Sequence, residues 1–564
     1  MGYDQGNDII KQNYLILIIG VALLTSIVLI YLIQGLTSRS VDQEYQISEN
    51  RDQYLTAVNY YGSAWVINFW NSDFSSTDQN MERIKKDGFN TIILIIPWRE
   101  FQPGISPPKY NDVAFGRLNY IIEKAGLHNL NVILRISYPW DFYPDDQLTI
   151  DQRLIDLNWD QDIYNAWLDY VHKIYTNVKD YENVKLAFIS WEDFWLPVDQ
   201  AVNLQKLSER IKLAKQTGFS DYLSSKYDLD SLSNIYGYKI NSSESIPTPL
   251  RKSPAFVLFL EFYDQQIIQK FLKPAQTQYP NLSMEIRVDK DPIYYPNGTI
   301  GWYSHSSTYN FTGSNYTTIY YSASMGAKNN YDFQTANKAL SLMNYTLYHV
   351  KNYTGDNKIF VDQFIWYDNT QGFESNTKIF YNETASFLQG ACKYLKNYTN
   401  GYGVWTYQDY AFNIIYNPTF SLGTSGWQVN GITRLEQNGI NLENGASVTQ
   451  LISKTRFPDF FLNPTGIVSF HARAQTPTAD LSIELEGSEF IQHIENDSTY
   501  HFQTPIADMK NLNIVFRNLN GSVTISDVKL YNFVQQGDVY DKDSQPKSSL
   551  EPIRQLNQCL LDKT

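Results

Sequence analysis

The stretch GFNTIILIIPWREFQPG, residues 88–104, decides the fold. Its five consecutive branched apolar residues, 92–96, form a run that is too apolar for a half-exposed strand. Such a run is typical of a strand buried on both faces, as in a parallel sheet covered by helices. The run ends abruptly at the sequence PWRE, residues 97–100. In a barrel of alternating strands and helices, ligands bind at the carboxyl ends of the strands. The stretch therefore predicts a buried barrel strand that leads into a binding site.

The same pattern recurs along the chain and predicts a closed set of eight strands. The other seven runs are 63–69, 131–137, 184–190, 282–288, 318–322, 358–361 and 403–406. Between them lie segments with helical spacing of apolar residues, such as 113–129 and 163–179. A helix around 255–273 lies in the long gap before the fifth strand and indicates a helical insertion. This alternation predicts an α/β fold, a (β/α)8 TIM barrel, over residues 60–414.

The composition changes after the barrel. Short alternating strands separated by Asn/Gly turns, for example 467–472, 481–485, 512–516 and 523–530, predict an all-β sandwich over 415–534. Residues 535–564 are polar, and we expect them to form a disordered tail. The two cysteines, Cys392 and Cys559, are free or paired, and we assign them no chemistry.

The N-terminus predicts a membrane anchor. Residues 13–35 are uncharged and almost wholly apolar, and a helix of 20 residues rises about 30 Å, the thickness of the hydrocarbon layer. The alternative is a cleaved signal peptide, whose apolar core is shorter, at about 7–15 residues. We expect residues 1–12 to be a cytoplasmic stub and 36–59 a polar stalk. Eleven Asn-X-Ser/Thr acceptors all follow the anchor, which favours an extracellular, glycosylated body at the cell membrane.

Bulk composition limits the class of partner. The formal net charge is -14, which argues against nucleic acid. Aromatic residues make up 15% of the chain, and Trp, Tyr, Asp and Glu gather at the predicted strand ends. Aromatic faces stack on the apolar face of a sugar ring, and carboxylates pair with its hydroxyls. We therefore expect an oligo- or polysaccharide ligand. No His/Asp/Glu cluster has metal-ligand spacing and no cofactor motif is present, so we predict neither a catalytic metal ion nor a cofactor.

Taken in order, the motifs of residues 60–412 resemble the cellulase-like clan of barrel glycoside hydrolases, clan A. The resemblance rests on GFNTIILIIPWREFQP, on NVILRISYPWDF and on the strand before Trp191-Glu192-Asp193. Separately, NPTFSLGTSGW and VTISDVKLYNF resemble the carbohydrate-binding jelly-roll modules that are appended to such enzymes. The resemblance implies hydrolysis of β-linked glycans.

The resemblance also assigns catalytic roles. Glycoside hydrolysis uses two carboxyl groups, one as proton donor and one as nucleophile or base. The clan's acid/base falls on Glu192, which Trp191 and Trp195 flank with apolar surroundings. The alternative is a loop glutamate in an ordinary ion pair. The clan's nucleophile position falls on Gln363, a neutral amide.

Three replacements for the missing carboxylate remain open. Asp362 is the nucleophile if a register shift turns it inward, and Glu374 is the nucleophile if its loop swings into the site. Asp193 supplies the negative charge if the strand does not continue past Glu192. Otherwise the barrel is a surface glycan-binding protein that has lost hydrolysis. A third possibility is a structural cell-envelope glycoprotein.

The remaining candidates are predicted to bind substrate. Aromatic residues at the strand ends are either sugar platforms or core, and Arg287 and Asp289 either bind hydroxyls or pair with each other. Tyr321 is a candidate for orienting the nucleophile. The aromatic platform candidates are Trp98, Trp140, Trp191, Trp366 and Trp405.

Overall fold

The computed structural model describes residues 53–562 except 63, 141–151, 296, 324–332, 356, 369–375, 438, 454–459, 461–462, 486–487 and 507–510. The predicted stub, membrane helix and most of the stalk lie outside the described residues, and so does Glu374. Within the part of the chain that is described, no helix combines the length and the apolar character needed to cross a membrane.

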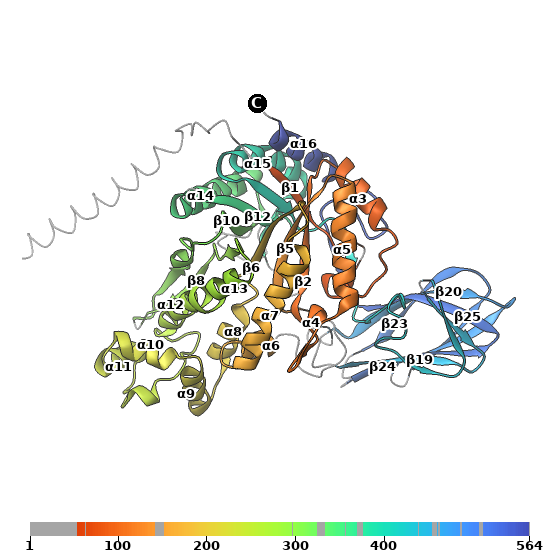
Figure 1. The fold of residues 1–564 in the computed structure, drawn as a ribbon, viewed down its shortest axis with the longest axis horizontal. Helices are drawn as coiled ribbons and strands as arrows, with labels where there is room; N and C mark the ends of the chain where they lie inside the picture. Colours follow the sequence, from red (N-terminus) through yellow and green to blue (C-terminus); the bar gives the residue numbers. More distant parts are fainter. Residues whose placement is uncertain are drawn as a thin grey trace, which may run out of the picture. The chain divides into compact units, whose positions relative to one another are not determined.

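Eight parallel strands form a closed barrel, which confirms the predicted (β/α)8 architecture (Figure 1). Neighbouring strands in the ring follow one another in the sequence, and the last strand pairs with the first. The strands are β1 (Leu55–Asn59), β2 (Thr91–Pro97), β5 (Asn131–Tyr138), β6 (Val184–Ser190), β7 (Ser283–Ile286), β10 (Tyr316–Ser322), β12 (Lys358–Ile365) and β14 (Gly401–Val404).

The first predicted strand is wrong. The first strand is β1, which lies inside the predicted stalk and is buried along its whole length. The apolar run at 63–69 instead contains a short buried helix, α2 (Val66–Phe69). A short apolar run fits a buried strand and a buried helix equally well, because periodicity cannot separate the two over so few residues.

Helices surround the barrel and cover the outer faces of its strands. They are α3 (Thr77–Lys86), α5 (Asp112–Leu127), α7 (Gln161–Val178), α14 (Ala336–Thr354) and α15 (Thr384–Tyr398) (Figure 1). Two of them start with an N-cap residue: the side chain of Asn111 accepts from two backbone N–H groups of α5, and that of Asp160 does the same for α7. Outward-facing residues of β2, such as Ile92 and Leu94, pack into the core against these helices.

The predicted helical insertion between β6 and β7 is confirmed. It contains α8 (Trp195–Asn203), α9 (Leu207–Gln216), α10 (Phe219–Lys226), α11 (Leu229–Tyr236), α12 (Phe256–Gln266), a π-helix η2 (Ile267–Leu272) and α13 (Lys273–Gln278). After β7 the chain forms a hairpin of β8 (Lys290–Tyr294) and β9 (Ile300–Ser304). Both additions follow the carboxyl ends of barrel strands, the end at which a site is expected.

The C-terminal region contains two five-stranded antiparallel sheets, as the alternating pattern predicts. One sheet has the order β16 (Gln428–Asn430), β19 (Ser447–Ser453), β24 (Asn511–Asn520), β21 (Ala479–Leu485) and β22 (Ser488–Ile494). The other has the order β17 (Thr433–Glu436), β18 (Gly439–Glu443), β25 (Ser522–Tyr531), β20 (Thr465–Ala474) and β23 (Ser498–Pro505).

The prediction of a disordered tail after residue 534 is wrong. The tail forms β26 (Val534–Gln535), which pairs with β15 (Tyr410–Ala411), and ends in the helix α16 (Leu550–Leu561). That helix contacts α15 and β1, and the disulfide between Cys392 and Cys559 joins it to α15. It buries Ile553 and Leu560, whose helical spacing is hidden in a polar composition. In the sequence, the two sheets therefore lie between β14, the eighth barrel strand, and α16, a helix that packs beside β1, the first barrel strand.

Candidate active site

The inside of the barrel changes from apolar to charged along its axis. Inward-facing apolar side chains form a separate cluster in the lower part of the barrel: Leu55, Ala57, Ile93, Ile133, Leu186, Phe188 and Phe360. Side chains alternate between the two faces of a strand, so the next inward position lies two residues further along. On β5 and β12 these positions hold Arg135 and Asp362, and on β7 Glu285 pairs with Ser190, two residues after Phe188. A charged layer therefore lies above the apolar one, toward the carboxyl ends of the strands.

Arg135 is the centre of this layer. Its Nε and Nη2 atoms donate to the two carboxylate oxygens of Asp193 at 3.1 and 2.8 Å. Nη2 also donates to Oε2 of Glu192 at 3.2 Å, and Nη1 lies 3.9 Å from an oxygen of Asp362. Burial by itself lowers the pKa of Arg135, but the surrounding carboxylates outweigh it and raise that pKa well above its ordinary value. One permanent positive charge thus holds carboxyl groups from three different positions together.

Glu285 and Asp362 form a second contact inside the barrel. The hydroxyl of Ser190 donates to Oε1 of Glu285, while Oε2 of Glu285 and Oδ1 of Asp362 bond to no donor among the described residues. Desolvation and the nearby charge of Asp362 raise the pKa of Glu285 well above its ordinary value. A protonated Glu285 can donate to Asp362, and this shared proton satisfies both oxygens.

The cluster has more acidic groups than its single cation can neutralise. Desolvation raises the pKa of Asp193 to about 7, against the attraction of Arg135. Desolvation also raises the pKa of Asp362 to about 6. Four carboxyl groups surround one guanidinium, and burying them all as ions is costly, so protons take the place of missing cations. Among the described residues no group of His, Cys, Asp and Glu side chains is arranged to hold a metal ion.

A bulge in β12 brings Gln363 into the same site. The pairing of β12 with β10 shifts so that Ile319 pairs with Val361 and Tyr320 pairs with Gln363, leaving Asp362 unpaired. An extra residue in one strand changes the side on which the following residues lie. Asp362 continues the inward series that Phe360 begins, and the bulge turns Gln363 inward as well.

Glu192 and Gln363 meet at the open end of the barrel. Nε2 of Gln363 donates to Oε2 of Glu192 at 3.3 Å, the oxygen that also accepts from Arg135. The side chain of Glu192 is 55% exposed, whereas those of Asp193 and Asp362 are 4% and 2% exposed. Glu192 is therefore the one carboxyl group of this cluster that solvent, and hence a ligand, can reach directly.

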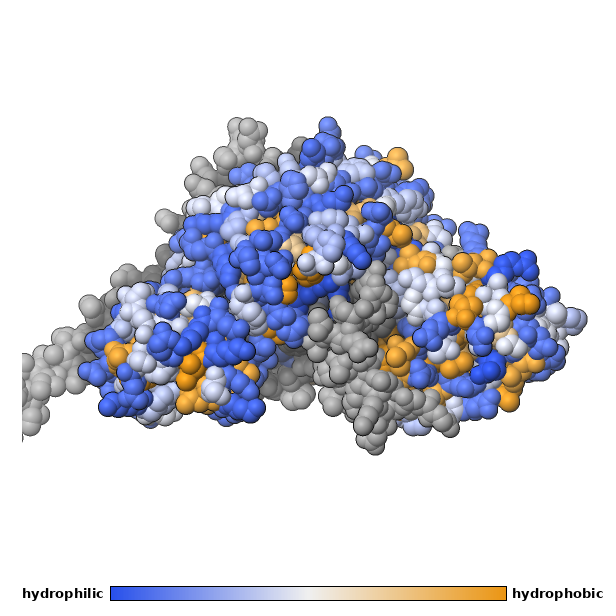
Figure 2. Space-filling model, turned by 60° about the horizontal axis from the view of Figure 1, so that its bottom comes forward, coloured by the Kyte–Doolittle hydropathy of each residue, from blue (hydrophilic) through white to orange (hydrophobic). Residues whose placement is uncertain are grey.

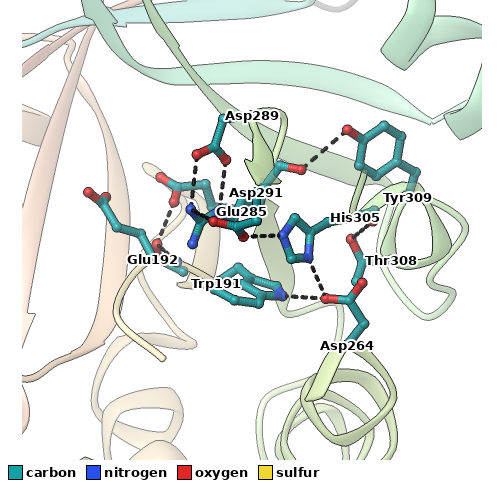
Figure 3. A network of polar contacts seen from close by, with 11 residues as sticks. Trp191, Glu192, Asp264, Glu285, Asp289, Asp291, His305, Thr308 and Tyr309 are labelled. Atoms are coloured by element: carbon teal, nitrogen blue, oxygen red, sulfur yellow. Dashed lines mark hydrogen bonds and ion pairs between the residues drawn. The ribbon is translucent and has the colours of Figure 1, made fainter. Parts of the chain in front are cut away.

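A polar network beside Glu192 joins the hairpin β8–β9 to helix α12 (Figure 3). Nδ1 of His305 lies 2.8 Å from Asp264, and Nε2 of the same ring lies 2.9 Å from Asp291. The indole N–H of Trp191 donates to Asp264 at 3.1 Å. Burial lowers the pKa of His305, but the two aspartates outweigh it and raise that pKa above its usual range. The network fixes Trp191, the residue before Glu192, while Glu192 itself points away from it (Figure 3).

Several predicted platforms turn out to be core residues. Trp191 is fully buried, and Trp98 is buried with its indole N–H bonded to Gln102. Tyr321 faces outward from the barrel, where its hydroxyl donates to the backbone of Ala339. Trp98 and Trp191 are therefore core residues, one of the two predicted possibilities. Tyr321, the candidate for orienting the nucleophile, fills the layer between strands and helices instead.

The other predicted residues divide between the site and its surroundings. Arg287 and Asp289 pair with each other at 2.8 and 3.0 Å, one of the two predicted possibilities. Trp366 is buried, Trp405 is 9% exposed and packs edge-on against Tyr61, and Trp140 is exposed.

The predicted apolar surroundings of Glu192 are wrong. The rings of Trp191 and Trp195 lie 5.5 Å apart, and Arg287 stacks over Trp195 at 4.1 Å. The partners of Glu192 are instead Arg135 and Gln363. The turn after β6 directs the carboxylate to the inside of the barrel and the indoles to the outside.

Sequence reasoning missed four residues of the site: Arg135, Glu285, Ser190 and Tyr320. A lone charge in the middle of an otherwise apolar strand was the available signal for Arg135 and Glu285, since an unpaired charge cannot be buried there. The charges of Asp289, Arg287 and Glu192 act on Tyr320, and desolvation raises its pKa well above the usual range. No local signal separates Tyr320 from Tyr321, because the choice between them depends on the register of β10.

Comparisons with known proteins concern the barrel. No protein-family model matches the sequence, and no curated protein matches it. Among solved structures, an exo-β-1,4-mannosidase from Opitutaceae bacterium strain TAV5 is 11% identical, with a TM-score of 0.36, over 64% of this chain and 54% of the other. The chain thus spans about half the length of that enzyme.

Two further structures give a similar result. A family 5 glycoside hydrolase from Streptomyces cattleya in complex with GlcNAc is 13% identical, with a TM-score of 0.39, over 64% of this chain and 72% of the other. A catalytic mutant of a family 42 β-galactosidase from G. stearothermophilus is 10% identical, with a TM-score of 0.45, over 64% of this chain and 53% of the other. All three neighbours are glycoside-cleaving enzymes, and each alignment covers 64% of this chain.

Proposed function

We propose that the protein is a glycoside hydrolase that cleaves β-linked glycans with Glu192 as the proton donor. The observation that carries this proposal is the exposed carboxyl group of Glu192 at the carboxyl end of β6, held by Arg135 and Gln363 from β5 and β12. In barrels of this type, side chains from the ends of several strands assemble the active site. A proton donor must reach the glycosidic oxygen, and within this cluster Glu192 alone has the exposure to do so.

Hydrolysis of a glycosidic bond requires one protonated and one negatively charged group near the bond that breaks. Glu192 protonates the leaving oxygen, and positive charge develops on the sugar ring as the bond lengthens. The cluster beneath it supplies negative charge from those of its carboxyl groups that carry no proton, although the side chains of Asp193 and Asp362 are not exposed. Of the predicted aromatic platforms, Trp140 is exposed and Trp405 is 9% exposed, and these two are the proposed sugar platforms.

We place the enzyme on the outside of the cell membrane, tethered by the apolar segment 13–35. The Asn-X-Ser/Thr acceptors support an extracellular body. The disulfide between Cys392 and Cys559 supports it too, because disulfides persist in oxidising compartments. The surface in Figure 2 is predominantly hydrophilic, with hydrophobic residues in small, separate groups, as expected for a body in contact with solvent.

The test is the Glu192→Gln variant assayed on a panel of nitrophenyl β-glycosides. Loss of general acid catalysis lowers kcat by about 10²–10⁴-fold. The loss is smaller on a dinitrophenyl glycoside, whose better leaving group needs less help from an acid. Glu182→Gln is the matched control, because Glu182 is exposed and lies just before the opposite end of the same strand. Full activity in Glu192→Gln, with unchanged folding by circular dichroism, removes the assignment.

A glycan-binding protein without hydrolysis is the second candidate. Gln363 favours it, because a neutral amide is a poor nucleophile and stands where the clan's glutamate is expected. Under this alternative the wild-type protein binds oligosaccharides in calorimetry but turns over no glycoside, and Gln363→Glu gains hydrolysis. Turnover by the wild-type protein eliminates this candidate.

A further inference from the structure

We propose that the substrate is a β-linked 2-acetamido-2-deoxy sugar, and that its own acetamido carbonyl oxygen acts as the nucleophile. This inference rests on the proposed function, since it names the sugar class that Glu192 serves. It explains how a site with one exposed carboxyl group and one amide can carry out a reaction that ordinarily needs two carboxyl groups.

The first step of the argument is the position of the acidic groups. A carboxylate that attacks the anomeric carbon must touch the substrate. The side chains of Asp193 and Asp362 are 4% and 2% exposed, and Glu285 is 1% exposed and bonded to Ser190. Asp289 is more exposed, but both of its oxygens accept from Arg287. Among the described residues of the cluster, none but Glu192 can both reach a sugar and change partners.

The second step is the orientation of Gln363. Its Nε2 donates to Oε2 of Glu192 at 3.3 Å, so its carbonyl oxygen Oε1 faces away from that carboxylate. No donor among the described residues bonds to Oε1, and the residue is 7% exposed at the open end of the barrel. An amide oxygen accepts hydrogen bonds, so Oε1 can accept one from a ligand that enters this end. The N–H of a sugar acetamido group is such a donor, and its carbonyl oxygen lies on the other side of the same planar amide.

The reaction then balances with groups that are present. The acetamido carbonyl oxygen forms a bond to C1 while the bond between C1 and the glycosidic oxygen breaks, and the proton of Glu192 goes to the leaving oxygen. The product is an oxazolinium ion, whose N–H donates to Oε1 of Gln363. Glu192, now a carboxylate, takes a proton from water as the hydroxide adds to C1 and the ring opens. One water is consumed, and the configuration at C1 is retained.

Gln363 is suited to this role because it links the two partners. The same side chain that receives the acetamido N–H donates to Glu192, so the acid and the internal nucleophile are held in a fixed relation. A neutral amide leaves the carbonyl oxygen of the substrate as the attacking atom. A carboxylate in the same place competes with it for C1.

The experiment compares three sets of substrates with the wild-type protein. The first is the 4-nitrophenyl β-glycosides of N-acetylglucosamine and N-acetylgalactosamine, the second is the corresponding glucoside and galactoside, and the third carries mono-, di- and trifluoroacetamido groups. We expect turnover of the first set and none of the second. Across the third set we expect kcat/KM to fall with each fluorine, because fluorine withdraws electrons from the attacking oxygen.

The Gln363→Met variant tests the residue itself. Methionine has a similar length but no hydrogen-bonding amide, and we expect kcat on the acetamido substrates to fall by about 10²–10³-fold, the usual cost of removing one preorganised hydrogen-bonding group. Gln265→Met is the control, because Gln265 is an exposed glutamine on the insertion helix α12.

Each outcome decides between the two proposals. Turnover confined to acetamido sugars, with the fluorine dependence, supports the inference. Equal turnover of glucosides, no response to fluorination, or full activity in Gln363→Met overturns the inference but leaves the glycoside hydrolase standing. No turnover of any substrate overturns both.

Discussion

Replacing Asp193 with asparagine tests whether the charged layer of the barrel is held together by protons. The folded protein raises the pKa of Asp193 from 3.8 to about 7, chiefly through desolvation. A carboxyl group with a raised folded-state pKa binds its proton more tightly in the folded than in the unfolded protein. Its contribution to stability is therefore complete below the unfolded pKa and is lost as the pH rises toward the folded value.

The size of the effect follows from the difference between the two pKa values. Each pH unit well between them corresponds to about 1.4 kcal/mol, and less close to the folded pKa, so raising the pH from about 5 to about 7 removes about 2 kcal/mol of stability through Asp193. The asparagine side chain of the variant does not titrate. Whatever constant effect the substitution has on the contact with Arg135, the free energy of unfolding of Asp193→Asn relative to wild type increases by about 2 kcal/mol across this interval.

Chemical denaturation at a series of pH values between 5 and 8 measures this difference, and the Asp180→Asn variant, changed at an exposed turn, serves as the control. The comparison uses the difference between two proteins, so other titrating groups cancel. A difference that stays constant with pH, or that moves in the opposite direction, refutes the account of the cluster, because Asp193 then keeps an ordinary or lowered pKa beside Arg135.

Three further changes have defined outcomes. The disulfide between Cys392 and Cys559 closes a loop of 167 residues, and its reduction is expected to lower the free energy of unfolding by about 2–5 kcal/mol. Denaturation with and without reductant measures this loss, and equal denaturation midpoints contradict the prediction. Arg135→Met leaves buried carboxylates without their cation and is expected to cost about 3–5 kcal/mol, more at pH 8 than at pH 5; a loss that is larger at the acid end speaks against this reading. In Gly403→Ala the new Cβ lies 2.4 Å from a terminal carbon of Ile93 inside the barrel, and we expect about 1–3 kcal/mol of destabilisation. Thermal melting measures it, and an unchanged melting temperature shows that the barrel interior has room for the added methyl group.

Much of the fold could be predicted because its signals are local. Seven of the eight barrel strands lie at or beside the predicted runs, and the strands of the sheets alternate with a period of two. Where the prediction failed, the local signal was ambiguous or masked. The run at 63–69 fits a buried helix as well as a strand, and the apolar face of α16 is hidden among polar residues.

The candidate site was only partly predictable. Glu192, Asp193, Asp362 and Gln363 could be singled out because they directly follow, or end, buried strands. Their partner Arg135 could not, because it lies within β5 and reaches the ends of β6 and β12 only after the ring has closed.

The sequence by itself determined where the strands and helices lie and at which end of the barrel polar side chains gather, because hydrophobic periodicity and strand ends are properties of neighbouring residues. The tertiary structure alone decided which of those side chains meet. A one-residue bulge in β12 turned Gln363 toward Glu192, the register of β10 turned Tyr320 inward and Tyr321 outward, and the closing of the barrel placed Arg135 among four carboxyl groups. Register and closure depend on contacts between distant segments, and a shift of one residue reverses the face on which every side chain lies.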